Sequence, residues 1–370
     1  VIVDETSMVD FAMMARLVDA VRGATRLVLL GDRHQLASVE AGTVLADLCG
    51  PVDAAALQAS PDLRAALASY DVPFGDAVVE RPTALPDAVV QLNRTYRFKG
   101  ESSIGRFAMA CLASDFDAEV AAAPLFAGAA DAHHFAPGDG RALPAPVLEA
   151  IVDAYVPAFE HLDQAKSVAP ADEPAFHRHT LDLFDRFRVL CAHKRGALGV
   201  EGVNAAVRQA LAERGRSTNG TFWTGRPILV RRNDYDVGLY NGDIGLVVTR
   251  RDAEGNPRTF VAFPGPDALP KEGAPPSDAQ LVRYVLPARL PEHDTCFALT
   301  IHKSQGSEYD HVMVVLPARP SRIVTRELLY TGVTRAKAKV SLVAERDAFV
   351  KALKETVQRA SGLRDALWGA

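Results

Sequence analysis

Short apolar runs that end in polar clusters recur along this chain, and they alternate with stretches of helical period. Residues 1–3 and 27–30 are two such runs, and apolar residues recur at helical spacing between Phe11 and Val21. A strand, a helix and a second strand of this length predict a right-handed parallel unit. Because their apolar residues are continuous, we expect both strands to be buried on both faces.

The later part of the chain repeats this alternation around a different middle segment. Residues 221–295 contain short apolar runs separated by Gly- and Pro-rich turns, and Asn241-Gly242-Asp243 is a hairpin signal. We expect this segment to form a small β-barrel inserted into a larger α/β domain. The surrounding α/β elements are predicted as strands over 89–92, 188–192, 296–301, 311–316 and 340–343, and as helices over 102–116, 199–211 and 325–337.

Composition restricts the possible classes of protein. Of the 370 residues, 48% are hydrophobic and 24% are charged, which is typical of a soluble globular protein. No apolar run reaches the roughly 18 residues that span a bilayer, so we expect no membrane association. The net charge of −5 shows no general basic footprint, so any nucleic acid must bind in a local groove.

Metal clusters are not favoured by the residue spacing. The four cysteines, at positions 49, 111, 191 and 296, form no C-x-x-C pair, and this usage fits a reducing cytoplasm. His133-His134 and His177-x-His179 lack supporting carboxylate or Cys spacing, so a site for zinc is improbable there.

Two carboxylates, Asp4 and Glu5, follow the first strand, where ligands of open α/β sheets bind. An Asp there can hold Mg²⁺ through water and a Glu can orient an attacking water, although a strand ending in a solvated turn has the same pattern. The neighbouring strand ends in Gly31–Leu36, whose Gln35 either reaches a γ-phosphate or belongs to a polar loop.

Two arginines are candidates for stabilising phosphoryl charge. Arg97 follows the strand expected at 89–92, and its guanidinium either faces a cleft or forms a surface ion pair. Arg335 lies near the end of the helix expected at 325–337, where it can project into an interdomain cleft.

Taken together, these segments resemble the ordered motifs of superfamily 1 DNA helicases. The five matching stretches are Asp4-Glu5 (motif II), 31–36 (motif III), Tyr96-Arg97 (motif IV), 302–308 (motif V) and 330–336 (motif VI). Within this superfamily the sequence is most similar to the RecD family, the α subunits of exodeoxyribonuclease V. That similarity rests on residues 35–42, 94–98, 241–245 and 361–363.

The resemblance implies an α/β fold with two RecA-like P-loop NTPase domains, the first truncated, that bind ATP between them. The implied boundaries are a partial first motor domain (1–90), a second motor domain (91–222 and 296–350) carrying the small β-barrel (223–295), and a C-terminal tail (351–370).

The resemblance also implies roles for the catalytic residues. Asp4 would coordinate Mg²⁺, Glu5 would activate water and Gln35 would sense the γ-phosphate. Arg97 and Arg335 would be the two arginine fingers.

Further residues are expected to bind the two ligands. Gly31 and Asp32 are expected beside the nucleotide, and Gly306 and Glu308 at its ribose and phosphates. The residues expected near the DNA backbone are Thr300, just before motif V, and His302 and Lys303 within it.

One motif of the family is missing from these residues. The phosphate loop G-x-x-x-x-G-K-[ST] occurs nowhere in the 370 residues and is expected upstream of Val1. We therefore expect a fragment with an exposed edge or gap in its first sheet and no significant ATP hydrolysis of its own.

The resemblance predicts a function for the intact protein. It would be a cytoplasmic, ATP-dependent 5′→3′ helicase subunit that acts with the other two exodeoxyribonuclease V subunits on single strands and duplex ends during double-strand break repair and recombination. Two alternatives stay open: an ATPase-inactive module that binds DNA or partners, and a stand-alone RecD-like helicase.

Overall fold

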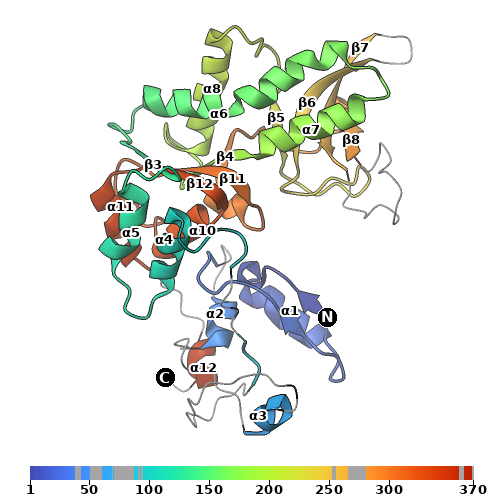
Figure 1. Ribbon diagram of the computed structural model, residues 1–370. Coiled ribbons are helices and arrows are strands. Elements are labelled where there is room, and N and C mark those ends of the chain that lie inside the picture. The colour runs from blue at the N-terminus through green and yellow to red at the C-terminus, as the bar shows by residue number, and fades with distance from the viewer. Residues whose placement is uncertain are drawn as a thin grey trace.

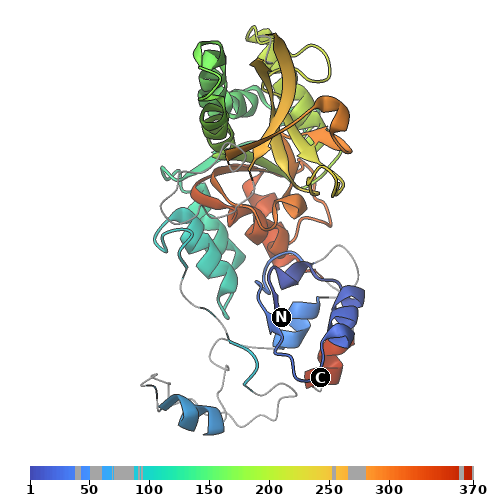
Figure 2. The same ribbon diagram turned by 90° about the vertical axis from the view of Figure 1, so that its right-hand side faces the viewer.

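The computed structural model describes residues 1–37, 43–50, 61–68, 70, 87–90, 92, 95–251, 256–265, 281–357 and 362–368. These residues form three parts, which Figures 1 and 2 show stacked along one direction. A small N-terminal unit lies at one end, a parallel α/β unit lies in the middle, and an antiparallel sheet with long helices lies at the other end.

The first unit contains the predicted strand–helix–strand. Strands β1 (Ile2–Val3) and β2 (Val28–Leu29) pair in parallel, and α1 (Phe11–Ala20) connects them. The expectation that these strands are buried on both faces is wrong, because Ile2 is 72% exposed. A described sheet of two short strands is too small to enclose residues on both sides.

The second unit is a five-stranded sheet in the order β10-β4-β11-β12-β3, and all its described pairings are parallel. Its strands are β3 (Ala132–Phe135), β4 (Phe187–Cys191), β10 (Ala298–Thr300), β11 (Tyr309–Val315) and β12 (Ala336–Val343).

Helices cover both faces of this sheet. One face packs against α4 (Ser103–Leu112), α5 (Ala118–Phe126), α10 (Arg326–Val333) and α11 (Arg346–Lys354), and the other against α6 (Ala145–Asp163), α7 (Glu173–Asp185) and α8 (Val200–Glu213). Along β11 the side chains alternate between these two cores, since Val312 joins the first and Met313 the second. Strands buried on both faces explain the continuous apolar runs of this part of the sequence.

The register of the sheet separates two edges. Thr300, Cys191, Val315 and Val343 are aligned at the carboxyl edge, whereas Tyr309 and Ala336 pair at the amino edge. Residues just before β11 and β12 therefore meet at one edge, and residues just after β10 and β11 meet at the other.

The inserted segment contains the predicted short strands in an antiparallel sheet ordered β8-β7-β6-β5-β9. The strands are β5 (Pro227–Val230), β6 (Ile244–Arg251), β7 (Pro257–Pro264), β8 (Val282–Val285) and β9 (His293–Thr295).

This sheet is not closed into the expected barrel within its described strands, because β8 and β9 are its two edges and have no pairing with each other. Its two faces are nevertheless buried. Val248 and Ala262 join the core that includes α7, and Val247 and Val261 form a core of their own. Because α7 covers one face of the sheet, that face is buried without closure of the strands into a barrel.

Several predicted boundaries also change. The helix at 102–116 is confirmed as the shorter α4, which the Ser102 side chain caps. The strand expected over 89–92 is wrong at its described residues, which have no strand structure and include exposed Val90 and Leu92. Residue 91, the expected domain boundary, lies outside the described residues.

The C-terminal tail does not begin at residue 351, because α11 continues to Lys354 within the second unit. Helix α12 (Leu363–Trp368) then contacts α2 (Val44–Cys49) of the first unit, and Figure 1 shows the two side by side. The tail therefore joins the two units. All four cysteines are unpaired, and among the described helices none is long and apolar enough to cross a membrane.

Candidate nucleotide site between the two units

The loop after β2 meets the second unit through its backbone. Leu36 N donates to Thr331 Oγ1 of α10 at 2.9 Å, and Gln305 Nε2 donates to Leu36 O at 2.7 Å. The His34 ring lies edge-on to Tyr330, with ring centroids 6.4 Å apart. Burial is the main cause that lowers the pKa of His34, and it favours the neutral ring in this contact. Motifs III, V and VI of the sequence are thus in direct contact.

Glu5 has an uncommon backbone conformation at this junction. Its φ of 49° and ψ of 39° are left-handed, which is rare for a residue other than glycine and is often found at functional sites. A Cβ built on Gly306 would lie 4.0 Å from Glu5 Oε1, so the carboxylate of Glu5 approaches the turn that follows η5 (Ile301–Ser304) in the second unit.

Asp4 occupies a different position from Glu5. Its side chain is exposed and accepts the backbone N–H of Glu5 at 2.8 Å. The described residues contain no group of three or more His, Cys, Asp or Glu that could hold a metal ion. A Mg²⁺ ion at Asp4 would therefore take most of its oxygen ligands from water and phosphate, as Mg²⁺ commonly does.

Asp32 organises the loop that carries Gln35. Its two carboxylate oxygens accept His34 N at 2.9 Å and Gln35 Nε2 at 3.1 Å. The amide group of Gln35 is thereby oriented, and its Oε1 is buried without a hydrogen-bond partner among the described residues.

Gly31 is explained by packing. A Cβ at this position would lie only 2.7 Å from Leu45 Cδ2 and 3.2 Å from the backbone nitrogens of Thr6 and Ser7. Gly31 thus allows close packing against Leu45, and Asp32 orients the Gln35 amide. Both residues shape the loop that carries Gln35.

Arg335 is fully buried yet only partly satisfied. Its Nη1 donates to Ser307 O at 3.2 Å, whereas Nε and Nη2 have no partner among the described residues. Burial lowers the pKa of Arg335, the nearby Arg97 lowers it further, and Glu5 and Asp32 oppose this effect. A buried guanidinium with two unsatisfied donors has the chemistry to bind an anion.

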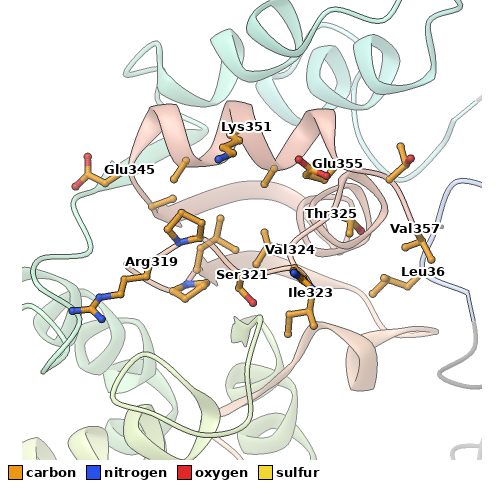
Figure 3. Close-up of a pocket in the computed structure, with 18 of the residues that line it drawn as sticks. Leu36, Arg319, Ser321, Ile323, Val324, Thr325, Glu345, Lys351, Glu355 and Val357 are labelled. Carbon is orange, nitrogen blue, oxygen red and sulfur yellow. The ribbon is translucent and has the colours of Figure 1, made fainter.

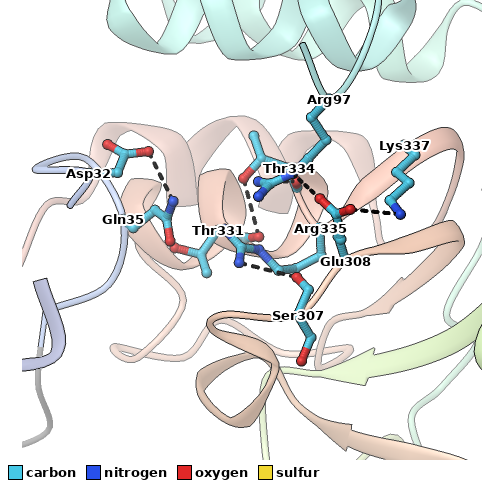
Figure 4. Close-up of polar contacts among 9 residues, drawn as sticks. All are labelled: Asp32, Gln35, Arg97, Ser307, Glu308, Thr331, Thr334, Arg335 and Lys337. Carbon is cyan, nitrogen blue, oxygen red and sulfur yellow. Dashed lines mark hydrogen bonds and ion pairs between the residues drawn. The ribbon is translucent and has the colours of Figure 1, made fainter. Parts of the chain in front are cut away.

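Arg97 comes from a distant segment and lies beside Arg335. Its Nε pairs with Glu308 Oε2 at 2.9 Å, and its Nη1 donates to Thr334 O at 3.2 Å. Figure 4 shows Arg97, Arg335 and Glu308 gathered beyond the end of α10, with Asp32 and Gln35 at its other side. The surface ion pair considered as an alternative for Arg97 is thus present, but it lies within the cluster of motif residues.

The donor set fits a nucleotide phosphate group with Mg²⁺. Two arginines, an oriented Gln35 and the carboxylate of Glu5 meet at the junction of two α/β units, as phosphoryl-transfer sites require. The unsatisfied donors of Arg335 are the observation that points most directly to an anion.

A separate groove lies at the carboxyl edge of the second sheet. It has a volume of about 1220 Å³, and Thr300 and His302 line it. Figure 3 shows it beneath α11, with Arg319 and Glu345 toward one end and Leu36 and Val357 toward the other. Lys303, the next residue after His302, is exposed, and its backbone N–H donates to Thr300 Oγ1 at 3.3 Å.

Three basic side chains that the sequence did not single out also line the groove: Arg319, Arg322 and Lys351. A signal was present, because the first two follow the tip of β11 just as the motif V residues follow the tip of β10. Leu36 lines the groove, and its neighbour Gln35 belongs to the candidate nucleotide site. The loop after β2 therefore contacts both the groove and the nucleotide site.

Comparison with known proteins gives matches that agree with these features. Residues 295–343 match a model of the UvrD-like helicase C-terminal domain, and residues 1–60 match an AAA domain. The RecBCD enzyme subunit RecD of Mycolicibacterium smegmatis is 37% identical over 368 residues, which are 99% of this chain and 54% of that protein. The RecD subunit of Haemophilus influenzae is 33% identical, over 98% of this chain and 53% of its own length.

More distant matches include the ATP-dependent RecD2 DNA helicase of Deinococcus radiodurans, which is 26% identical over 91% of this chain and 35% of that protein. Among solved structures, Pif1 helicase from Candida albicans has a TM-score of 0.39 and 14% identity, over 99% of this chain and 74% of that one. Bacteroides Pif1 in complex with ADP-AlF3 and ssDNA has a TM-score of 0.38 and 15% identity, over 93% and 70%.

The fold and the matches define an α/β protein of the RecA-like P-loop NTPase type, with matches to helicase domains. Within that class, the chain is similar to RecD subunits over 98–99% of its length. It spans about half the length of the RecD relatives just named.

Proposed function

We propose that the protein to which this chain belongs is an ATP-dependent 5′→3′ DNA helicase subunit of an exodeoxyribonuclease V complex. In this proposal, the junction of the two units at Glu5, Arg97 and Arg335 is the hydrolysis site and the groove at the carboxyl edge holds single-stranded DNA. The observation that carries it is the buried Arg335, whose two unsatisfied donors lie beside Arg97 in the field of Glu5.

Each residue at the phosphate end of the site has a defined task. Glu5 accepts the proton of the attacking water, and Gln35 places its amide against that water or the γ-phosphate. Arg97 and Arg335 stabilise the negative charge that develops on the transferred phosphoryl group. Asp4 would hold Mg²⁺, which would supply further charge neutralisation.

Motif V connects the two ligands. Gly306 lies near Glu5 and Glu308 pairs with Arg97, whereas Thr300 and His302 line the groove, and we assign the former pair to the nucleotide and the latter, with the neighbouring Lys303, to DNA. The hydrogen bond from Gln305 to Leu36 links this segment to the loop of Gln35. We infer that closing the junction on ATP moves the groove walls relative to each other, which is the elementary step of translocation.

The groove suits a nucleic acid backbone in its chemistry. Arg319, Arg322 and Lys351 offer phosphate contacts and Thr300 offers a hydroxyl group, whereas two carboxylates, Glu345 and Glu355, also line the groove. Three basic against two acidic side chains give the groove a small positive excess on a chain of net charge −5, which supports DNA binding on a confined surface.

The direction of movement, the repair role, the cytoplasmic location and the two partner subunits are proposed from the RecD relatives. The stand-alone reading is supported by the match to the Deinococcus radiodurans RecD2 helicase. Purification of the protein from its own cells separates the two. Co-purification of two large subunits in stoichiometric amount supports the complex. A monomer that unwinds DNA alone supports the stand-alone helicase.

A binding module without ATPase activity is the second candidate, because no phosphate loop occurs in these 370 residues. We expect the chain by itself to show no significant ATP hydrolysis. The deciding experiment measures hydrolysis by the whole protein with and without single-stranded DNA. DNA-stimulated turnover supports the motor, and its absence leaves the binding module.

A further inference from the structure

Glu308 pairs with two cations at once, one on each carboxylate oxygen. Its Oε2 lies 2.9 Å from Arg97 Nε, and its Oε1 lies 2.7 Å from Lys337 Nζ. Figure 4 shows the carboxylate between the two cationic side chains. All three side chains are partly exposed, so packing does not lock them in place. None of the motif roles predicted from the sequence involves Lys337.

The ion pair with Glu308 engages part of the Arg97 guanidinium. Arg97 Nε donates to the Glu308 carboxylate and its Nη1 donates to Thr334 O. In the adjacent Arg335, Nε and Nη2 have no partner among the described residues. A phosphoryl group that meets Arg335 would therefore compete with Glu308 for Arg97. The outcome depends on how strongly Glu308 retains Arg97.

Lys337 weakens that retention in two ways. Two cations on one carboxylate repel each other, so each lowers the affinity of the carboxylate for the other. Lys337 also remains as a counter-ion when Arg97 departs, so Glu308 is not left as an unpaired anion.

We propose that Lys337 is a positioning residue that allows Arg97 to leave Glu308 and engage the phosphoryl group. This inference rests on the proposed function, since it requires phosphoryl transfer at this junction. Without Lys337, Arg97 becomes the main cation on Glu308, and more of its population stays paired there.

The experiment uses Lys337→Met and Lys337→Arg in the whole protein, with saturating single-stranded DNA and varied ATP. Lys337→Met should lower kcat roughly three- to fivefold, the upper end of the size expected for losing one member of an exposed charge network, and should change KM for ATP less than about twofold. Lys337→Arg keeps the charge and should restore kcat. The matched control is Lys339→Met, because Lys339 lies on the same strand and its charge acts on His311.

A second variant tests the link through Glu308. Glu308→Gln removes the charge that retains Arg97, so adding Lys337→Met in that background should change kcat by less than about twofold. Equal losses of kcat in both backgrounds would overturn the inference, as would a normal kcat for Lys337→Met.

Two readouts separate other causes. Thermal unfolding of each variant should match the parent protein, since the three side chains are partly exposed. If the parent protein itself shows no DNA-stimulated hydrolysis, the proposed function fails and the inference fails with it. If the parent is active and Lys337→Met equals Lys339→Met, only the inference fails.

Discussion

Thr331 Oγ1 accepts the backbone N–H of Leu36 at 2.9 Å, although the two residues are 295 positions apart in the chain. Both groups are buried, and the bond joins the loop of Gln35 to α10. Together with the bond from Gln305 to Leu36 O, it fixes the relation of the two units at the point where site and groove meet.

Removing the acceptor of this bond should destabilise the protein. Thr331→Val leaves the Leu36 N–H buried without a partner, and the free energy of unfolding should fall by about 1–3 kcal/mol. The measurement is urea unfolding. The control is Thr334→Val. The Thr334 hydroxyl donates to Tyr330 O at 2.7 Å one turn earlier, so its loss should lower the free energy of unfolding by less. Equal losses would show that the contact between the units contributes nothing specific.

Arg335 should be required for turnover and not for folding alone. Arg335→Ala in the whole protein should lower kcat by roughly 10³-fold or more, because an arginine finger acts on charge that exists only in the transition state. Arg335→Lys should retain a small part of the activity, since one ammonium cannot reproduce the guanidinium fork. A near-normal rate for Arg335→Ala would remove this role.

The groove residues should control affinity for DNA and its dependence on salt. Arg319→Ala, Arg322→Ala and Lys351→Ala should each weaken binding of a labelled single strand. Each should also reduce the slope of log K against log salt by about 1 where a phosphate contact is lost. Lys166→Ala serves as the control, because the exposed Lys166 lies outside the groove lining. Unchanged slopes for all three variants would place the DNA elsewhere.

His177 should make the protein less stable in mild acid. It is 1% exposed, contacts Tyr284 Oη through Nδ1 at 2.8 Å, and has its pKa lowered from 6.5 to about 4, first by burial and then by Arg250. Between these pH values the unfolded imidazole binds a proton and the folded one does not. Stability is therefore retained above pH 6.5 and falls by roughly 2–3 kcal/mol as the pH drops toward 4.

The check compares urea unfolding at neutral pH and at mildly acidic pH. His177→Gln should flatten the pH dependence, whereas His133→Gln, at an exposed position, should leave it unchanged. An unaltered acid loss in His177→Gln would assign it to other groups.

Much of the fold was accessible from the sequence because apolar periodicity reports local structure directly. The continuous runs that form β4, β11 and β12 are buried on both faces, and the turn signals around Asn241 do separate antiparallel strands. The order of motifs also predicted which segments meet. Glu5, Gln35, Arg97 and Arg335 do lie at one junction.

The remaining features depend on contacts between segments far apart in the chain. Nothing near Lys337 indicates that its ammonium meets Glu308, and nothing near Gly31 indicates that Leu45 fills the space beside it. The small β-barrel predicted for the insertion is a sheet that the described strands do not close, and its covering by α7 cannot be read from the strands themselves. Exposure of Ile2 was likewise set by the size of the sheet around it.

The central claim is that the junction of the two units is the site of ATP hydrolysis, with Glu5 as the base. Its most direct test is single-turnover ATP hydrolysis by the whole protein carrying Glu5→Gln, with Asp19→Asn on the exposed side of α1 as the control. The account predicts that Glu5→Gln binds ATP within a few-fold of the parent but hydrolyses it at least about 10²-fold more slowly. Hydrolysis at the parent rate by Glu5→Gln would contradict it.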